Sequence, residues 1–182
     1  MARSTIPRLG YALLGLLSQQ PSSGYDIRKI FTQTPMGSFS DSPGAIYPAL
    51  RRLEAQNLVR GQVSSSGLRQ RKIFRLTPAG ATAFKQWLKR PVKGDDLVRR
   101  VDDLLLRFSF MHRTLGEAGA VRFLKALREE LAAYVPFLRG YYNSHKAELA
   151  PSEHLALESG VRQYETLLRW SEHALATYGS KS

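Results

Sequence analysis

Residues 42–59 read SPGAIYPALRRLEAQNLV, a stretch that predicts a capped helix running directly into a strand. Ser42 can cap this helix by accepting a hydrogen bond from a first-turn amide, and Pro43 suits the first helical position, where no N–H is needed. Apolar residues recur at helical spacing and predict a buried stripe of Ile46, Leu50 and Leu53. The other side of the helix is predicted to carry Tyr47, Arg51, Arg52 and Glu54.

The segments on either side of this stretch complete a small domain. Residues 9–17 predict a short buried helix, and Ser23 with Asp26 predicts a capping box for a second helix. Residues 58–63 and 71–76 predict the two strands of a hairpin, and Thr77-Pro78 predicts the start of another helix. Three helices, a hairpin and a further helix, in that order, predict a winged helix-turn-helix domain in a mainly α protein.

Positive charge is concentrated in the first half of the chain. The 182 residues carry a formal net charge of +12, and residues 1–90 hold 14 lysines and arginines against three acidic residues. Residues 91–182 hold 13 lysines and arginines against 12 acidic residues. A soluble surface does not need such asymmetry. The first half is therefore predicted to bind a polyanion, and nucleic acid is favoured over an anionic membrane.

The third helix and the hairpin are the predicted contacts with double-stranded DNA. A helix fits the major groove, and a basic hairpin can follow the adjacent backbone or minor groove. An alternative is that the arginines form an ordinary solvated face and that the hairpin cations only protect an edge strand. Their place in a strongly basic domain favours DNA contact. The candidate DNA-binding residues are Tyr25, Ser42, Gly44, Tyr47, Arg51, Arg52, Arg69, Arg71 and Lys72.

The second half of the chain predicts an all-helical dimerisation domain over residues 93–182, after a winged domain over residues 1–92. Thr114 and Glu117 predict a capping box between two of its helices. Apolar residues then recur at heptad spacing along two helices, as they do along the seam of a coiled coil. The predicted dimer interface consists of Leu124, Leu127, Leu131, Leu138, Leu157, Val161, Tyr164, Leu168 and Leu175.

Enzymatic and metal chemistry find little support in the sequence. It has no cysteine, no phosphate-binding loop, no nucleophile elbow and no zinc-hydrolase motif, so neither an enzyme nor a cofactor is predicted. Metal-ligand spacing is also missing among the four histidines, His112, His145, His154 and His173. Two tryptophans are candidates for a pocket that binds a small aromatic effector, although buried tryptophans more often pack in a core: Trp87 and Trp170.

The apolar run near the N-terminus does not predict membrane insertion. Arg3 and Arg8 precede residues 9–17, as in a signal peptide, but no small-x-small cleavage pattern follows. The run is also far shorter than the roughly 20 residues of a membrane-spanning helix. We therefore expect a soluble, cytoplasmic protein that does not bind membranes.

Three motifs resemble the PadR family of bacterial transcription regulators: YALLGLLSQQPSSGYDI at 11–27, SPGAIYPALRRLEAQNLV at 42–59 and RKIFRLTPAGATAF at 71–84. The threonine-x-x-glycine element that follows the wing in this family falls on Thr77 and Gly80. One departure is Ser40, since the family often has a tryptophan at this position. The family signature itself falls on Ser42, Gly44, Ile46, Tyr47 and Pro48.

The resemblance implies a homodimer that binds a roughly palindromic operator, usually as a repressor that a small molecule or another signal releases. Two-fold symmetry fits half-sites about 10 bp apart. The resemblance also implies that proline is tolerated at the start of the recognition helix. Two alternatives remain: an RNA-binding protein that uses the same basic domain, and an adaptor whose heptad helices bind another protein.

Overall fold

The computed structural model describes residues 6–34, 43–66 and 69–180, with the backbone alone at residues 43, 64–66, 69 and 70. The described chain is mainly helical with a small antiparallel sheet, which confirms the predicted fold class. It divides into two compact units, Met1–Arg90 and Pro91–Ser182. Across the described ranges, none of the helices combines the length and the apolar character that crossing a bilayer requires.

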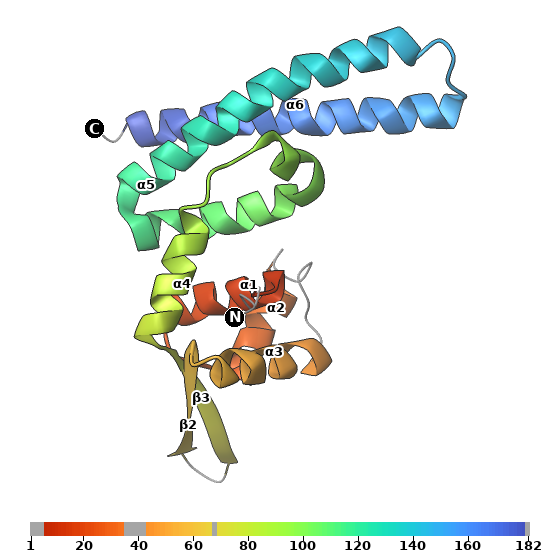
Figure 1. Cartoon of the computed structure of the whole chain (residues 1–182). Helices are drawn as coiled ribbons and strands as arrows, with labels where there is room; N and C mark the ends of the chain where they lie inside the picture. The colour runs from red at the N-terminus through yellow and green to blue at the C-terminus, as the bar shows by residue number, and fades with distance from the viewer. Residues whose placement is uncertain (1–5, 35–42, 67–68, 181–182) are drawn as a thin grey trace, which may run out of the picture. The chain divides into compact units, whose positions relative to one another are not determined.

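The first unit has the element order of a winged helix-turn-helix domain (Figure 1). The strands form an antiparallel sheet in the order β1-β3-β2, in which the short β1 adds to the edge of the predicted hairpin. The sequence did not indicate this third strand. The elements are α1 (Arg8–Gln19), β1 (Ser22–Ser23), α2 (Gly24–Gln33), α3 (Pro43–Ala55), β2 (Val59–Ser66), β3 (Arg69–Leu76) and α4 (Pro78–Leu88).

The core of the first unit lies between α1, α2, α3 and α4. The apolar stripe predicted on α3 is buried, because Ile46 and Leu50 have no exposed surface and Leu53 has almost none. Trp87 of α4 stacks on Tyr11 of α1, with ring centroids 4.6 Å apart and planes 5° from parallel. This stacking joins α1 to α4, and α1 in turn packs against α3 and β3.

A capping box begins α2, and a left-handed turn follows α3. Ser23 and Asp26 form the predicted capping box, since the Ser23 hydroxyl accepts from the Asp26 amide at 3.1 Å and the Asp26 carboxylate accepts from the Ser23 amide at 3.3 Å. Helix α3 begins at Pro43 and continues through Pro48. It then ends in a turn where Asn57 has a φ of 60°, a left-handed conformation that asparagine tolerates well.

Thr77 and Gly80 join the hairpin to α4. The Thr77 hydroxyl caps α4 by accepting from the Gly80 amide at 3.0 Å, and the Thr77 amide donates to the Leu58 carbonyl at 3.1 Å. A Cβ atom on Gly80 would lie only 2.0 Å from the Leu58 carbonyl oxygen. The threonine-x-x-glycine element is therefore the place where the first turn of α4 rests directly on the backbone that enters β2.

The second unit consists of two long helical elements, α5 (Gly94–His145) and α6 (Pro151–Gly179). Helix α5 is broken at Arg100 and at Gly116, where a φ of 71° and a ψ of 179° favour glycine. The segment before Gly116 packs back on the segment after it, because Phe108 stacks on Phe123 with centroids 6.1 Å apart. No hydrogen bond of the predicted capping box joins Thr114 and Glu117 within the described residues.

Part of the predicted dimer interface is buried within one chain. Helices α5 and α6 pack against each other within one chain, and most of the heptad residues of α5 are buried. Leu124, Leu127 and Leu131 have no exposed surface, and Val161 is 6% exposed, so these four have almost nothing to offer a second copy. The remaining members of the predicted interface keep partial exposure: Leu138, Leu157, Tyr164, Leu168 and Leu175.

Candidate nucleic-acid interface

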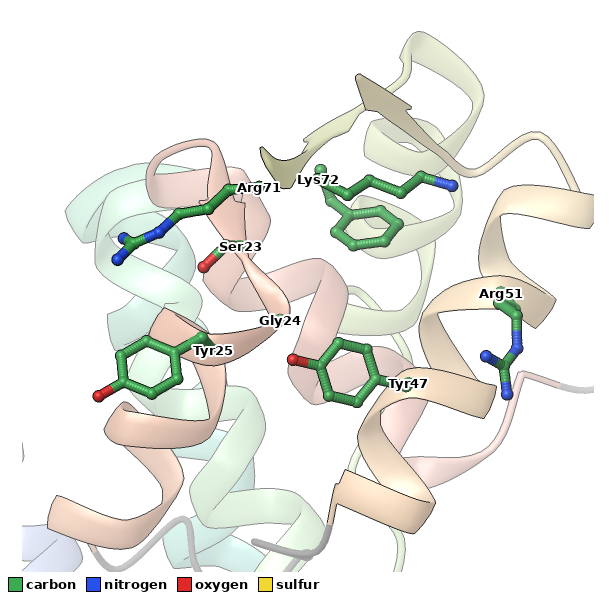
Figure 2. Close-up of a pocket in the computed structure, with 8 residues that line it drawn as sticks. Ser23, Gly24, Tyr25, Tyr47, Arg51, Arg71 and Lys72 are labelled. Atoms are coloured by element: carbon green, nitrogen blue, oxygen red, sulfur yellow. The ribbon is translucent and has the colours of Figure 1, made fainter. Parts of the chain in front are cut away.

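Helix α3, the start of α2 and strand β3 surround a shallow depression of about 400 Å³ in the first unit (Figure 2). Five of its residues carry the aromatic rings and cations that the sequence singled out, and we call them the basic face: Tyr25, Tyr47, Arg51, Arg71 and Lys72. Ser23, Gly24 and Phe74 complete the lining. Residues far apart in the sequence thus meet on one surface of the unit.

The Tyr47 ring packs closely against the backbone of Gly24. The Tyr47 ring projects from α3 and lies over the first residue of α2, where a Cβ on Gly24 would come within 2.5 Å of the ring. The Tyr47 side chain nevertheless stays 40% exposed. Glycine at position 24 therefore lets a tyrosine of α3 pack closely on α2 while part of the ring faces solvent.

Arg71 and Tyr25 form a second pair on the basic face. The Arg71 guanidinium carbon lies 6.0 Å from the centre of the Tyr25 ring, within the range of a cation–π interaction. Both residues are exposed, and Tyr25 is 58% exposed. An exposed tyrosine beside an arginine offers a hydroxyl and a guanidinium to the same polyanion.

Lys72 is bound within the unit to Glu54. The Lys72 ammonium donates to Glu54 Oε2 at 2.7 Å, and Glu54 Oε1 accepts from the Gly61 amide at 3.0 Å. The hydrogen bond from Lys72 holds the pKa of Glu54 below its usual value against the opposing effect of burial, and the Gly61 amide adds to the lowering. Glu54 thus ties the last turn of α3 to both strands of the hairpin, and Lys72 is partly neutralised.

Arg51 and Arg71 keep their charges unpaired, because no carboxylate of the described residues lies within ion-pair distance of either. Only two carboxylates of the first unit are described, and both are engaged: Asp26 caps α2, and Glu54 binds Lys72. Arg52 is exposed, and its guanidinium donates to the Pro48 carbonyl at 3.4 Å. Two of the three cations of the basic face, Arg51 and Arg71, therefore carry positive charge that no described carboxylate compensates.

The remaining candidate DNA-binding residues lie around the basic face or outside the described part. Gly44 is exposed on the first turn of α3. Arg69 begins β3 opposite Ser66, and its side chain lies outside the described part of the chain, as does all of Ser42. The contacts that Gly24 and Glu54 make were not evident from the sequence. The spacing of Glu54 after Arg51 placed it on the polar side of α3, but nothing in the sequence paired it with Lys72.

The two tryptophans do not share one environment. Trp87 is 5% exposed in the core of the first unit, stacked on Tyr11 and 5.8 Å from Phe84. This packing leaves the Trp87 ring almost no free surface for an effector. Trp170 belongs to the second unit and lines a pocket there. Within residues 6–34, 43–66 and 69–180, no group of three or more histidine or acidic side chains is arranged to hold a metal ion.

Comparison with known proteins finds relatives that match most of the chain. A negative transcriptional regulator of Bacillus subtilis, PadR, is 26% identical over 177 residues, which cover 92% of this chain and 96% of the relative. The transcriptional regulator YqjI of Escherichia coli is 35% identical over 130 residues, which cover 68% of this chain and 59% of the relative. A crystal structure of Bacillus subtilis PadR in complex with operator DNA aligns over 96% of this chain and 99% of that one, with 24% identity and a TM-score of 0.45.

The family match falls on the unit that carries the basic face. Residues 13–86 match the model of the transcriptional regulator PadR-like family, and this range includes α2, α3 and the hairpin. Residues 13–86 of the first unit therefore belong to the PadR-like family of transcriptional regulators.

Proposed function

We propose that this transcriptional regulator is a homodimeric, sequence-specific DNA-binding repressor. In this proposal α3 enters the major groove and the hairpin of β2 and β3 lies along the adjacent phosphate backbone. The observation that carries the proposal is the basic face. Arg51 on α3 and Arg71 on β3 have no ion-pair partner among the described residues, and both lie near exposed tyrosines of the same unit. Repression is supported by the Bacillus subtilis relative, which is a negative transcriptional regulator.

The proposal gives the two arginines different tasks. Arg51 lies on α3, the element that fits the major groove, and its planar guanidinium suits two hydrogen bonds to one guanine. Arg71 lies on β3 of the hairpin, where it would neutralise a backbone phosphate and contribute affinity for DNA of any sequence. Phosphate contacts release counterions, whereas base contacts discriminate between sequences.

Arg71→Ala and Arg51→Ala are expected to weaken DNA binding in distinguishable ways. Arg71→Ala should weaken binding to all duplexes and lower the slope of log K against log salt by about 0.9, the effect of one lost phosphate contact. Arg51→Ala should reduce the preference for the selected site over random duplex by about tenfold or more, the cost of a lost base contact. Fluorescence anisotropy over a salt series measures both, with a duplex that the wild-type chain selects from a random-sequence pool.

Lys85→Ala is the matched control, because it removes one exposed cation from α4, outside the basic face. It should leave both the salt slope and the sequence preference nearly unchanged. If Lys85→Ala and Arg71→Ala have equal effects, only net charge attracts DNA, and the proposed interface is wrong. If structured RNA competes as well as the selected duplex, the chain binds RNA instead.

The homodimer is proposed to form through the partly exposed apolar residues of the second unit. Leu157, Leu168 and Leu175 follow the heptad spacing of α6 and keep surface that α5 does not cover. We expect sedimentation equilibrium to give a dimer for the wild-type chain and a folded monomer for Leu168→Asp, because a carboxylate cannot enter an apolar contact without a large desolvation cost. Leu155→Asp, at an exposed position of α6 outside the heptad run, should remain dimeric. A dimer that persists in Leu168→Asp with unchanged circular dichroism would contradict this interface.

A further inference from the structure

A pocket in the second unit is lined by residues that belong neither to the basic face nor to the proposed dimer contact. Its volume is about 440 Å³, within the range of roughly 300–1,000 Å³ that small-molecule sites occupy. It is lined by α5 on both sides of the Gly116 break and by the last turns of α6. We call it the α5–α6 pocket, and it consists of Phe108, His112, Glu117, Trp170, His173, Ala174, Thr177 and Tyr178.

Aromatic rings from both helices form the walls of the α5–α6 pocket. The rings of Phe108 and Trp170 meet edge to face with centroids 5.4 Å apart, and Tyr178 lies 5.8 Å from His112. Phe108 is also held from behind by Phe123. All three pocket rings are half-buried rather than sealed, so part of each remains open to a ligand. The negative faces of such rings attract cations, and tryptophan attracts them most strongly.

The lining of the pocket contains one carboxylate, two histidines and no lysine or arginine. The carboxylate is that of Glu117. Glu117 is exposed and forms no hydrogen bond or ion pair within the described part of the chain, because the expected capping bond to Thr114 is not made. Its carboxylate is therefore available to a ligand, and an anionic ligand would find no strongly basic partner.

We propose that the α5–α6 pocket binds a small aromatic organic cation, with the positive group near Glu117 and the ring against Trp170 and Phe108. Such a ligand would touch both segments of α5 and the end of α6, and would hold the Gly116 break in the conformation described above. The inference is independent of DNA binding, because all of its residues belong to the second unit.

Phenyltrimethylammonium is a suitable probe, because it combines a ring with a permanent charge that does not titrate. Calorimetry on the full-length wild-type chain is expected to show binding, with affinity at least tenfold higher than for benzoate or benzyl alcohol. In a Trp87→Phe chain, which keeps Trp170 as the single tryptophan, the probe should change the indole fluorescence over the same concentration range. Benzoate binding as tightly as the cation would overturn the proposal, as would an unchanged Trp170 signal.

Glu117→Gln tests the contribution of the negative charge, because it removes the charge and leaves the size of the side chain nearly unchanged. The variant should bind phenyltrimethylammonium about fivefold more weakly and bind benzyl alcohol unchanged, since a partly exposed ion pair contributes modestly. Glu129→Gln removes an exposed carboxylate of α5 that does not line the pocket and should leave both affinities unchanged. Equal affinity of wild type and Glu117→Gln for the cation would refute the role of Glu117. Trp170→Leu should abolish the preference for aromatic over aliphatic ammonium ions.

Discussion

Gly80→Ala is expected to lower the free energy of unfolding of the first unit by about 3 kcal/mol, at the severe end of single substitutions. The added Cβ would lie 2.0 Å from the Leu58 carbonyl oxygen, which is backbone and cannot rotate away. Relief requires α4 to lift from the hairpin, which would break the bond from the Thr77 amide to Leu58. Urea denaturation in a Trp170→Phe background, followed by Trp87 fluorescence, measures the loss, because Trp87 lies in the core of the same unit.

Gly140→Ala serves as the control for a glycine within a helix. Nothing lies within 4 Å of a Cβ at that position, so the substitution should stabilise α5 by about 0.5–1 kcal/mol. If Gly80→Ala is as harmless as Gly140→Ala, then α4 does not rest on the Leu58 backbone as described.

Leu131→Asp is expected to unfold the second unit rather than to give a folded monomer. Leu131 has no exposed surface, and an aspartate there would bury a carboxylate in an apolar contact between helices. The penalty combines a lost leucine side chain with an unpaired charge, and we expect about 4 kcal/mol or more. Circular dichroism at 222 nm should show the loss of much of the helical signal of α5 and α6.

Ala132→Asp places the same charge one residue further along α5, at an exposed position. It should keep the circular dichroism spectrum and the melting temperature of the wild-type chain to within a few degrees. A folded Leu131→Asp chain that is only monomeric would instead place Leu131 at an interface between two copies.

The sequence was sufficient to predict most of the first unit, because its signals are local. Ser23 with Asp26, and Thr77 with Pro78, are cap motifs in which the interacting groups lie within three residues of each other. The apolar stripe of α3 was equally readable from its spacing. Strand β1 was not readable, because two serines have little strand propensity and form a strand only by pairing with Phe74 and Ile73.

The basic face was predictable in composition but not in arrangement. Charge and element order indicated Tyr47, Arg51 and Arg71, and the structure places them around one depression, while their contacts with DNA remain a prediction. The bond between Glu54 and Lys72 spans 18 residues and depends on the angle between α3 and the hairpin, which no local pattern encodes. The packing of Tyr47 on Gly24 is long-range in the same sense.

The heptad pattern of the second half predicted covered helix faces, and the structure buries Leu124, Leu127 and Leu131 within one chain, which leaves them no surface for a second copy. Heptad spacing shows that one face of a helix is covered, and a helix of the same chain covers a face as well as a second copy does. The break at Gly116 and the turn before α6 bring these faces together within one chain. Chain reversal of this kind is not visible in the spacing of apolar residues.

The close fit between Tyr47 and Gly24 also bears on the entropy of recognition. A flexible side chain loses rotational freedom when a ligand fixes it, and that loss opposes binding by about 0.5–1.5 kcal/mol for each chain immobilised. The Tyr47 ring already rests on α2 before any ligand arrives, so most of this freedom is lost during folding. Arg51, with no described partner, would lose its freedom only on contact. The entropy cost of ordering the side chain is therefore met during folding for Tyr47 and during binding for Arg51. Tyr47 is preorganised, and Arg51 can adapt to its ligand.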